Sequence, residues 1–171
     1  MKYSLTDSLD AFELHDELHK TIQRQVTLST PSGDIKNELI LGSDYRSEPP
    51  LFTANIEYEN AYFCGNGKMH TWEDAFASLQ RKLPEGVKIK CCMTCRHGNM
   101  CPVGDVQGKL FCTKDVTITE KSDLYFYTED EFEASKRYRD CADICESYKE
   151  QSEDFYTYND YLYCLNKADN T

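Results

Sequence analysis

The chain has 171 residues and a net charge of −11, with 30 acidic residues against 19 basic ones, and 40% of its residues are hydrophobic. This length is enough for one domain with a sizeable core, so the fold does not depend on disulfides. The acidic balance disfavours nucleic acid and anionic membranes as partners, because binding phosphate groups requires a basic surface.

The expected compartment is the cytoplasm. The first 20 residues contain no apolar segment of the kind found in a secretory signal, and no apolar run approaches the roughly 18 residues that span a bilayer. Thiols are kept reduced in the cytoplasm. The odd number of cysteines, nine, also fits poorly with a fully paired set of disulfides.

The first half of the chain, residues 1–90, has the pattern of an antiparallel β-sheet with one helix. Alternating apolar and polar residues predict strands at 21–30, 35–41, 53–64 and 87–90. A helix is expected to begin after Thr71, which is a good N-cap residue, and to end at Pro84. Its apolar stripe includes Trp72, Phe76 and Leu79. This half is therefore expected to form an α+β lobe.

The second half, residues 91–171, begins with a cysteine-rich segment and has weaker patterns. They predict a hairpin at 106–119, a short strand at 124–127 and C-terminal helices, one beginning near 128 and one at 152–165. In the first of these helices Cys141 and Cys145 are four residues apart and would share one face. We expect an α+β protein in which the 1–90 lobe and the 91–171 cysteine-rich part pack as one unit.

Five of the nine cysteines lie between Cys91 and Cys112. Within this segment the sequence Cys92-Met93-Thr94-Cys95 has the shape of a zinc knuckle, in which two thiolates of one tight turn bind a single ion. Gly98 follows closely, and a glycine there permits the positive φ that such turns often need. Free cysteine also packs well as a small hydrophobic residue, and that interpretation is the preferred one for Cys64 on its predicted strand. For the knuckle, metal binding is favoured over packing.

Zinc requires four ligands, so two more must come from elsewhere in the chain. We predict a site made of Cys92, Cys95, Cys112 and Cys145, with Cys101 and Cys141 in reserve and with Cys91 and His97 as outside candidates. Cys112 lies in the predicted hairpin, where a third ligand is common. Cys145 is preferred to Cys141 because Tyr148 follows it by about one helical turn and would shield its sulfur.

Two metals suit this set of ligands. Zinc is the usual choice for four thiolates in a cytoplasmic protein. The spacing over residues 91–148 also resembles small subunits that carry a high-potential-type iron–sulfur cluster, of the kind that accompany benzylsuccinate synthase. That resemblance implies an iron–sulfur protein for electron transfer or for assisting a larger enzyme.

The sequence therefore predicts a small cytoplasmic metal-binding protein with a structural zinc–thiolate site and a non-enzymatic binding or interaction role. An iron–sulfur protein is the alternative, and a cysteine-dependent enzyme is the third hypothesis. Residues 155–163 contain four tyrosines, a residue type enriched at protein interfaces, and offer a surface for a protein partner. The other interpretation is that these rings pack inward while their hydroxyls reach water.

Overall fold

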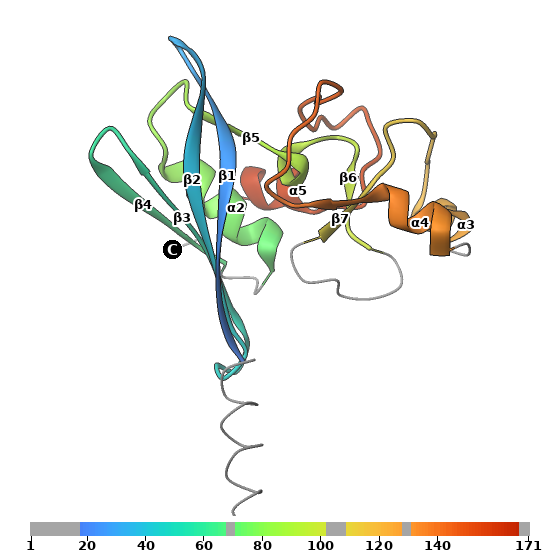
Figure 1. Ribbon diagram of the computed structural model, residues 1–171, viewed down its shortest axis with the longest axis horizontal. Coiled ribbons are helices and arrows are strands. Elements are labelled where there is room, and N and C mark those ends of the chain that lie inside the picture. Colours follow the sequence, from blue (N-terminus) through green and yellow to red (C-terminus); the bar gives the residue numbers. More distant parts are fainter. Residues whose placement is uncertain (1–17, 68–70, 102–108, 128–130, 168–171) are drawn as a thin grey trace, which may run out of the picture.

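The structure, a computed structural model, describes residues 18–67, 71–101, 109–127 and 131–167 and confirms the α+β class (Figure 1). In chain order the elements are β1 (His19–Thr30), β2 (Gly33–Asp44), β3 (Leu51–Tyr58), β4 (Ala61–Asn66), α2 (Trp72–Lys82), β5 (Lys88–Lys90), the 3-10 helix η1 (Cys92–Thr94), β6 (Gly98–Asn99), β7 (Lys109–Cys112), α3 (Lys121–Phe126), α4 (Glu131–Arg137), β8 (Tyr138–Asp140) and α5 (Tyr161–Asn166). Within these ranges no helix is long and apolar enough to cross a membrane.

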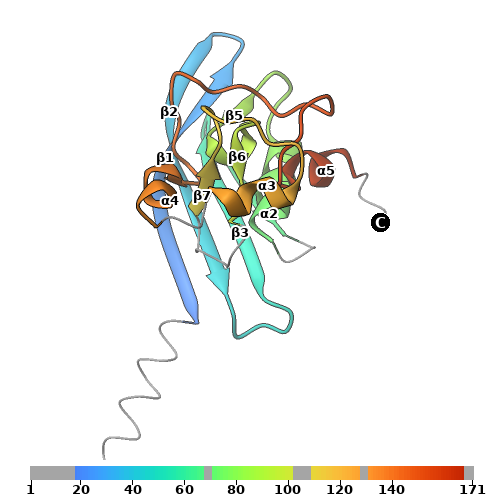
Figure 2. The ribbon, with the colours of Figure 1, turned by 90° about the vertical axis from the view of Figure 1, so that its right-hand side faces the viewer.

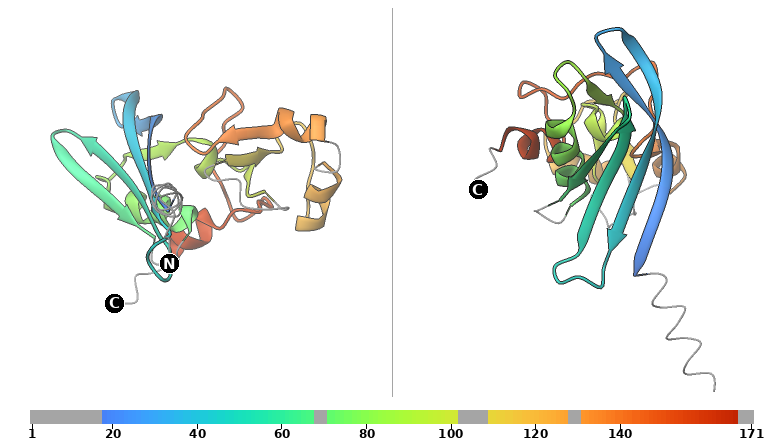
Figure 3. Two further views of the ribbon diagram at one scale, coloured as in Figure 1. Left: turned by 60° about the horizontal axis from the view of Figure 1, so that its bottom comes forward. Right: turned by 90° about the vertical axis from the view of Figure 1, so that its left-hand side faces the viewer.

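The first half forms a curled five-stranded antiparallel sheet in the order β4-β3-β2-β1-β5 (Figure 3). The predicted strands at 21–30, 35–41 and 87–90 are confirmed. The predicted strand at 53–64 is wrong as a single element, because the chain reverses at Glu59 and Asn60, which both have positive φ (51° and 62°). Tyr58 and Ala61 then pair across the turn, so this segment supplies two strands of the sheet, β3 and β4.

Helix α2 lies against one face of this sheet (Figure 3). It begins as predicted, with the Thr71 hydroxyl accepting a hydrogen bond from the backbone N–H of Asp74 (3.2 Å). Phe76 and Leu79 are fully buried, and they pack with Leu28, Leu39 and Ile56 and other residues of the sheet. The burial of this face supplies most of the hydrophobic stabilisation of the first half.

The second half contains a small sheet in the order β6-β7-β8, and Figure 2 shows its short elements in front of the large sheet. The predicted hairpin at 106–119 does not form within the described residues, since only Lys109–Cys112 is a strand. That strand is central, with β6 on one side and β8 on the other. Its apolar residues Leu110 and Phe111 are buried. Neighbouring strands cover both edges of β7, and residues of the two hydrophobic cores cover its faces, so no hairpin partner is needed.

The predicted strand at 124–127 is also wrong. Residues 124–126 belong to α3 and Tyr127 is its C-cap. At the start of this helix the Asp123 carboxylate accepts hydrogen bonds from the backbone N–H groups of Thr119 (2.7 Å) and Glu120 (3.2 Å). This local capping favours a helical turn. Leu124, which suggested the strand, packs instead with Phe111 and others in a second, smaller core of Phe111, Ile118, Leu124 and Ala134.

The predicted C-terminal helices are much shorter than expected. Helix α4 ends at Arg137 and the chain enters β8, so Cys141 and Cys145 follow in an irregular segment and do not share a helix face. The Asp140 carboxylate accepts from the backbone N–H of Ala142 (3.1 Å), and Asp143 accepts from that of Asp140 (3.1 Å). Such short-range bonds compete with the helix ladder. Of the predicted helix at 152–165, only α5 from Tyr161 onward forms.

The main hydrophobic core contains residues from both sides of Lys90. Cys91, Met93, Leu110, Cys141 and Tyr161 pack in the same cluster as the residues between the sheet and α2. Two polar contacts also join the halves: Arg81 of α2 donates to the carbonyl of Cys164 (2.6 Å), and Arg24 of β1 pairs with Asp140 (2.7 Å). The cysteine-rich segment thus packs against the hydrophobic core of the first half.

Candidate metal centre

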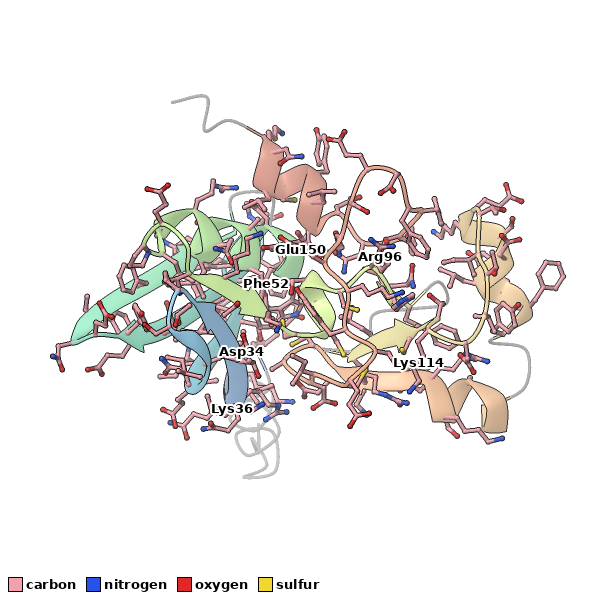
Figure 4. The ribbon with its side chains drawn as sticks, turned by 90° about the horizontal axis from the view of Figure 1, so that it is seen from above. Asp34, Lys36, Phe52, Arg96, Lys114 and Glu150 are labelled. Carbon is pink, nitrogen blue, oxygen red and sulfur yellow. The ribbon has the colours of Figure 1, made fainter. Side chains whose placement is uncertain are left out.

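The four thiols predicted as metal ligands line one small cavity. Cys92, Cys95, Cys112 and Cys145 surround it together with His97, Gly98, Leu110, Lys114, Arg139 and Ser147, and the cavity volume is about 10 Å³. Figure 4 shows sulfur atoms gathered where these segments meet, with Lys114 nearby on the side of β7. Three of the thiols are on buried residues, whereas Cys145 is exposed.

The knuckle is held by a network around Thr94. Its hydroxyl donates to the carbonyl of Ile89 (2.9 Å) and accepts from the backbone N–H of Cys91 (3.2 Å). The backbone N–H of Cys95 donates to the carbonyl of Cys92 (3.3 Å), which closes the 3-10 turn. Strand β5 leads directly into this turn, so the two cysteines begin from a strand anchored to β1.

Gly98 is required for a different reason from the one the sequence suggests. The motif predicts a positive φ at a glycine in the turn, but Gly98 is not among the glycines with positive φ. Instead, a Cβ added at Gly98 would overlap the carbonyl oxygen of Cys92. This close approach allows β6 to run beside the knuckle, and β6 pairs Gly98 with Cys112. The third thiol is thereby brought to the first two.

Cys145 reaches the cavity through backbone pairing and not through a helix. The backbone N–H groups of Cys92 and Met93 donate to the carbonyls of Asp143 (2.6 Å) and Cys141 (3.0 Å). Farther along, the backbone N–H of Arg96 donates to the carbonyl of Lys149 (2.8 Å), and Cys95 forms a bridge with Glu150. Residues 141–151 are therefore tied to the knuckle at both ends, and Cys145 lies between the ties.

Tyr148 has another role than the predicted shielding of the Cys145 sulfur. Its hydroxyl lies 3.1 Å from the Thr94 hydroxyl, and the Lys90 ammonium lies over its ring, 5.6 Å from the ring centroid. The ring therefore belongs to the support of the knuckle, and it is not among the side chains that line the cavity.

The reserve ligands do not line the cavity. The Cys101 thiol lies 3.8 Å from the Tyr138 hydroxyl, and the Cys141 thiol lies 3.8 Å from the Asp140 carboxylate. Cys141 and Cys91 are almost fully buried in the main core. Cys64 is only half-buried, with its thiol 3.1 Å from the Asn66 side-chain oxygen, so it is less buried than its strand pattern predicts.

The thiols are in surroundings that favour their protonated form. Burial raises the pKa of Cys91 to about 12, and it raises the pKa of Cys92 and Cys95 as well. Neighbouring thiols add to this effect: Cys95 and Cys112 raise the pKa of Cys92. These thiols are consequently poor nucleophiles on their own, because the thiolate is the reactive form.

The sequence analysis passed over two polar residues at the cavity, Lys114 and Arg139, and gave His97 only as an outside candidate. The first two bring positive charge to a place where thiolates would be negative. His97 Nδ1 is buried and has no hydrogen-bond partner within the described part of the chain. Burial lowers the pKa of His97, which favours the neutral imidazole. The closeness of His97 to the knuckle was the available signal, but spacing alone cannot show where its ring points.

As the side chains stand, no group of three or more His, Cys, Asp or Glu residues in the described ranges is arranged to hold a metal ion. The structure thus brings the four predicted thiols to one cavity without placing them at bonding distance. Their role as ligands stays a prediction.

The tyrosine-rich segment is divided between core and surface. Tyr161 is buried in the main core, and Tyr158 packs against the second core. Tyr156 and Tyr163 are 37% and 58% exposed. The inward-packing interpretation therefore applies to Tyr158 and Tyr161, and a partner surface at the exposed rings stays a prediction.

Comparisons with known proteins add no assignment to this geometry. No protein-family model, curated protein or solved structure matches the chain.

Proposed function

We propose that the chain binds one zinc ion through the thiolates of Cys92, Cys95, Cys112 and Cys145. The observation that carries the proposal is that these four thiols, which come from three separate segments, line a single cavity. Four thiolates are a common ligand set of structural zinc sites. Zinc binding would have to draw the four sulfurs inward, and the exposed Cys145 has the most freedom to move.

The chemistry of the ligand set favours zinc over an iron–sulfur cluster. Zinc is the usual metal for four thiolates in a reducing compartment. The tight Cys-x2-Cys-x2-Cys run of bacterial ferredoxins is absent from the sequence. The iron–sulfur hypothesis therefore ranks below zinc.

The proposed role of the ion is structural. The cavity has no room for a substrate beside the thiols, and the raised pKa values of Cys92 and Cys95 argue against a cysteine nucleophile. A bound ion would instead join the knuckle, β7 and residues 141–151, in addition to the backbone hydrogen bonds and core contacts between these segments. Lys114 and Arg139 would offset the negative charge that four thiolates leave around Zn²⁺.

We further propose a cytoplasmic binding or interaction protein without catalytic activity. The exposed rings of Tyr156 and Tyr163 support contact with a protein partner, since tyrosine combines a large apolar ring with a hydrogen-bonding hydroxyl. The acidic net charge agrees with a basic partner surface.

The first experiment is elemental analysis of the full chain, purified anaerobically. We expect colourless protein with one zinc per chain, and a chelator should remove the zinc and lower the thermal midpoint. Brown protein that contains iron and sulfide would favour the iron–sulfur alternative and contradict the zinc proposal. Protein that contains no metal and binds none on titration would contradict both.

The second experiment replaces one thiol of the site. Cys95→Ser should lower the free energy of unfolding by more than about 3 kcal/mol, because structural zinc contributes its binding free energy to folding. Cys64→Ser is the matched control: it removes a half-buried thiol outside the cavity and should have a small effect, with zinc retained. If Cys95→Ser unfolds at the same denaturant concentration as the parent, the site is not structural.

A further inference from the structure

The cavity contains five donors for a metal and not four. His97 lines the same cavity as the four thiols, and its Nδ1 is buried without a hydrogen-bond partner in the described residues. Leaving a buried polar atom unpaired costs free energy, so such an atom usually has an ion, a water molecule or another ligand beside it. In a cavity of thiols, a metal ion is the partner that chemistry favours for this nitrogen.

The imidazole is held in place from several sides. The backbone N–H of Thr113 and the side-chain amide of Asn99 both donate to the carbonyl of His97 (2.9 and 3.2 Å). The Phe155 ring meets the imidazole edge to face, with the ring centroids 5.6 Å apart. The backbone of His97 and one side of its ring are thus held in place, which limits the positions that the imidazole can take.

The four thiols are not equivalent. Cys92, Cys95 and Cys112 are buried and belong to η1, the bridge to Glu150, and β7. Cys145 is exposed and lies in a turn closed by the backbone N–H of Tyr148 donating to its carbonyl (3.0 Å). If one thiolate leaves the metal, it is therefore Cys145.

We propose that His97 Nδ1 replaces Cys145 as the fourth zinc ligand when the exposed thiolate leaves, so that the site alternates between four thiolates and three thiolates with one imidazole. The inference rests on the proposed zinc site. In the exchange the bond from zinc to the Cys145 sulfur breaks, the bond to His97 Nδ1 forms, and the released thiolate takes a proton from water. No electrons are transferred, and both ligand sets are known for structural zinc. The exposed thiol is then free for covalent modification while the ion stays bound.

The test loads the full chain and three variants with Co²⁺ in place of zinc, because charge-transfer absorption per cobalt grows with the number of bound thiolates. The variants are Cys145→Ser, His97→Gln, and the two combined. We expect Cys145→Ser to keep one metal per chain. Its charge-transfer absorption should fall by the contribution of one thiolate, and its metal affinity should fall no more than about 100-fold. X-ray absorption of its zinc form should show a nitrogen neighbour. Cys101→Ser, a half-buried thiol outside the cavity, should match the parent.

The double variant decides the inference. It should bind metal at least about 100-fold more weakly than Cys145→Ser, whereas His97→Gln alone, which keeps all four thiols, should lose far less affinity than the double variant. Equal affinities of the double variant and Cys145→Ser would overturn the role of His97, and so would complete loss of metal from a folded Cys145→Ser. Because Cys145 is exposed, its replacement should leave the fold intact, and circular dichroism checks this. A parent chain that binds no cobalt would instead contradict the proposed function itself.

Discussion

The two halves of the molecule are stabilised in different ways. In the first half, β1 and β2 have 12 residues each, and a continuous apolar layer lies between the sheet and α2. In the second half, β6, β7 and β8 have two, four and three residues, and the separate core consists of Phe111, Ile118, Leu124 and Ala134. Long strands with a covered face can be stable through burial alone, whereas strands this short contribute little by themselves.

This difference explains why the thiols gather where they do. The separate core of the second half contains four buried residues, so its segments also depend on the main core and on links between themselves. A metal ion that joins three segments supplies such a link without additional apolar area. The comparison predicts that substitutions in the two halves should have separable effects on stability and on metal content.

The largest effect in this comparison is expected from the first half. Phe76→Ala removes a fully buried ring from α2 and should lower the free energy of unfolding by about 3–5 kcal/mol, measured by denaturant titration. The folded fraction should still bind metal, because no cavity residue is changed. Phe126→Ala, at a ring 72% exposed, is the control and should change stability by less than about 0.5 kcal/mol. Loss of metal from folded Phe76→Ala protein would show that the halves are not separable.

A smaller loss of stability, combined with loss of the site, is expected for Gly98→Ala. The added methyl group overlaps the carbonyl oxygen of Cys92, so β6 must shift away from the knuckle at a cost of about 1–3 kcal/mol. Metal content by elemental analysis should fall with it, because β6 aligns Cys112. Gly33→Ala is a matched control, since a Cβ at Gly33 meets nothing within 4 Å and the cost comes only from its φ of +118°. Normal metal binding by Gly98→Ala would contradict this account of the site.

The smallest effect concerns Glu73, at the junction of α2 with the C-terminal segment. Burial raises the pKa of this carboxyl, and the nearby charge of Asp160 adds to the rise. The folded state therefore holds the proton more tightly than the unfolded state, and stability falls as the pH rises above the usual pKa of a glutamate. Glu73→Gln should remove this penalty, giving a small gain at pH 7 that disappears near pH 4. Denaturant titrations at the two pH values measure it, and an equal change at both would refute the titration of Glu73 as the cause.

Local sequence patterns correctly predicted the helices and strands that are specified by residues close together in the sequence. Thr71 caps α2 through its own hydroxyl, and the alternation of Val26 and Leu28 in β1 reflects a strand with one buried face. The turn at Glu59 and Asn60 was missed because neither residue is a glycine, and the left-handed conformation that both adopt is uncommon for other residues. The alternation on either side of it therefore looked like one long strand.

The candidate metal centre also has one part that the sequence predicted and another that only the fold decided. The spacing of Cys92 and Cys95 predicted a tight turn, and the 3-10 turn between them is held locally, because the Thr94 side chain hydrogen-bonds the Cys91 backbone at its start. The positions of Cys112, Cys145 and His97 at that turn were decided by tertiary structure. They depend on the close approach of Gly98 to Cys92, on β7 being a central strand, and on backbone hydrogen bonds between residues about 50 apart. Such contacts have no periodicity along the chain, and only the folded backbone brings them together.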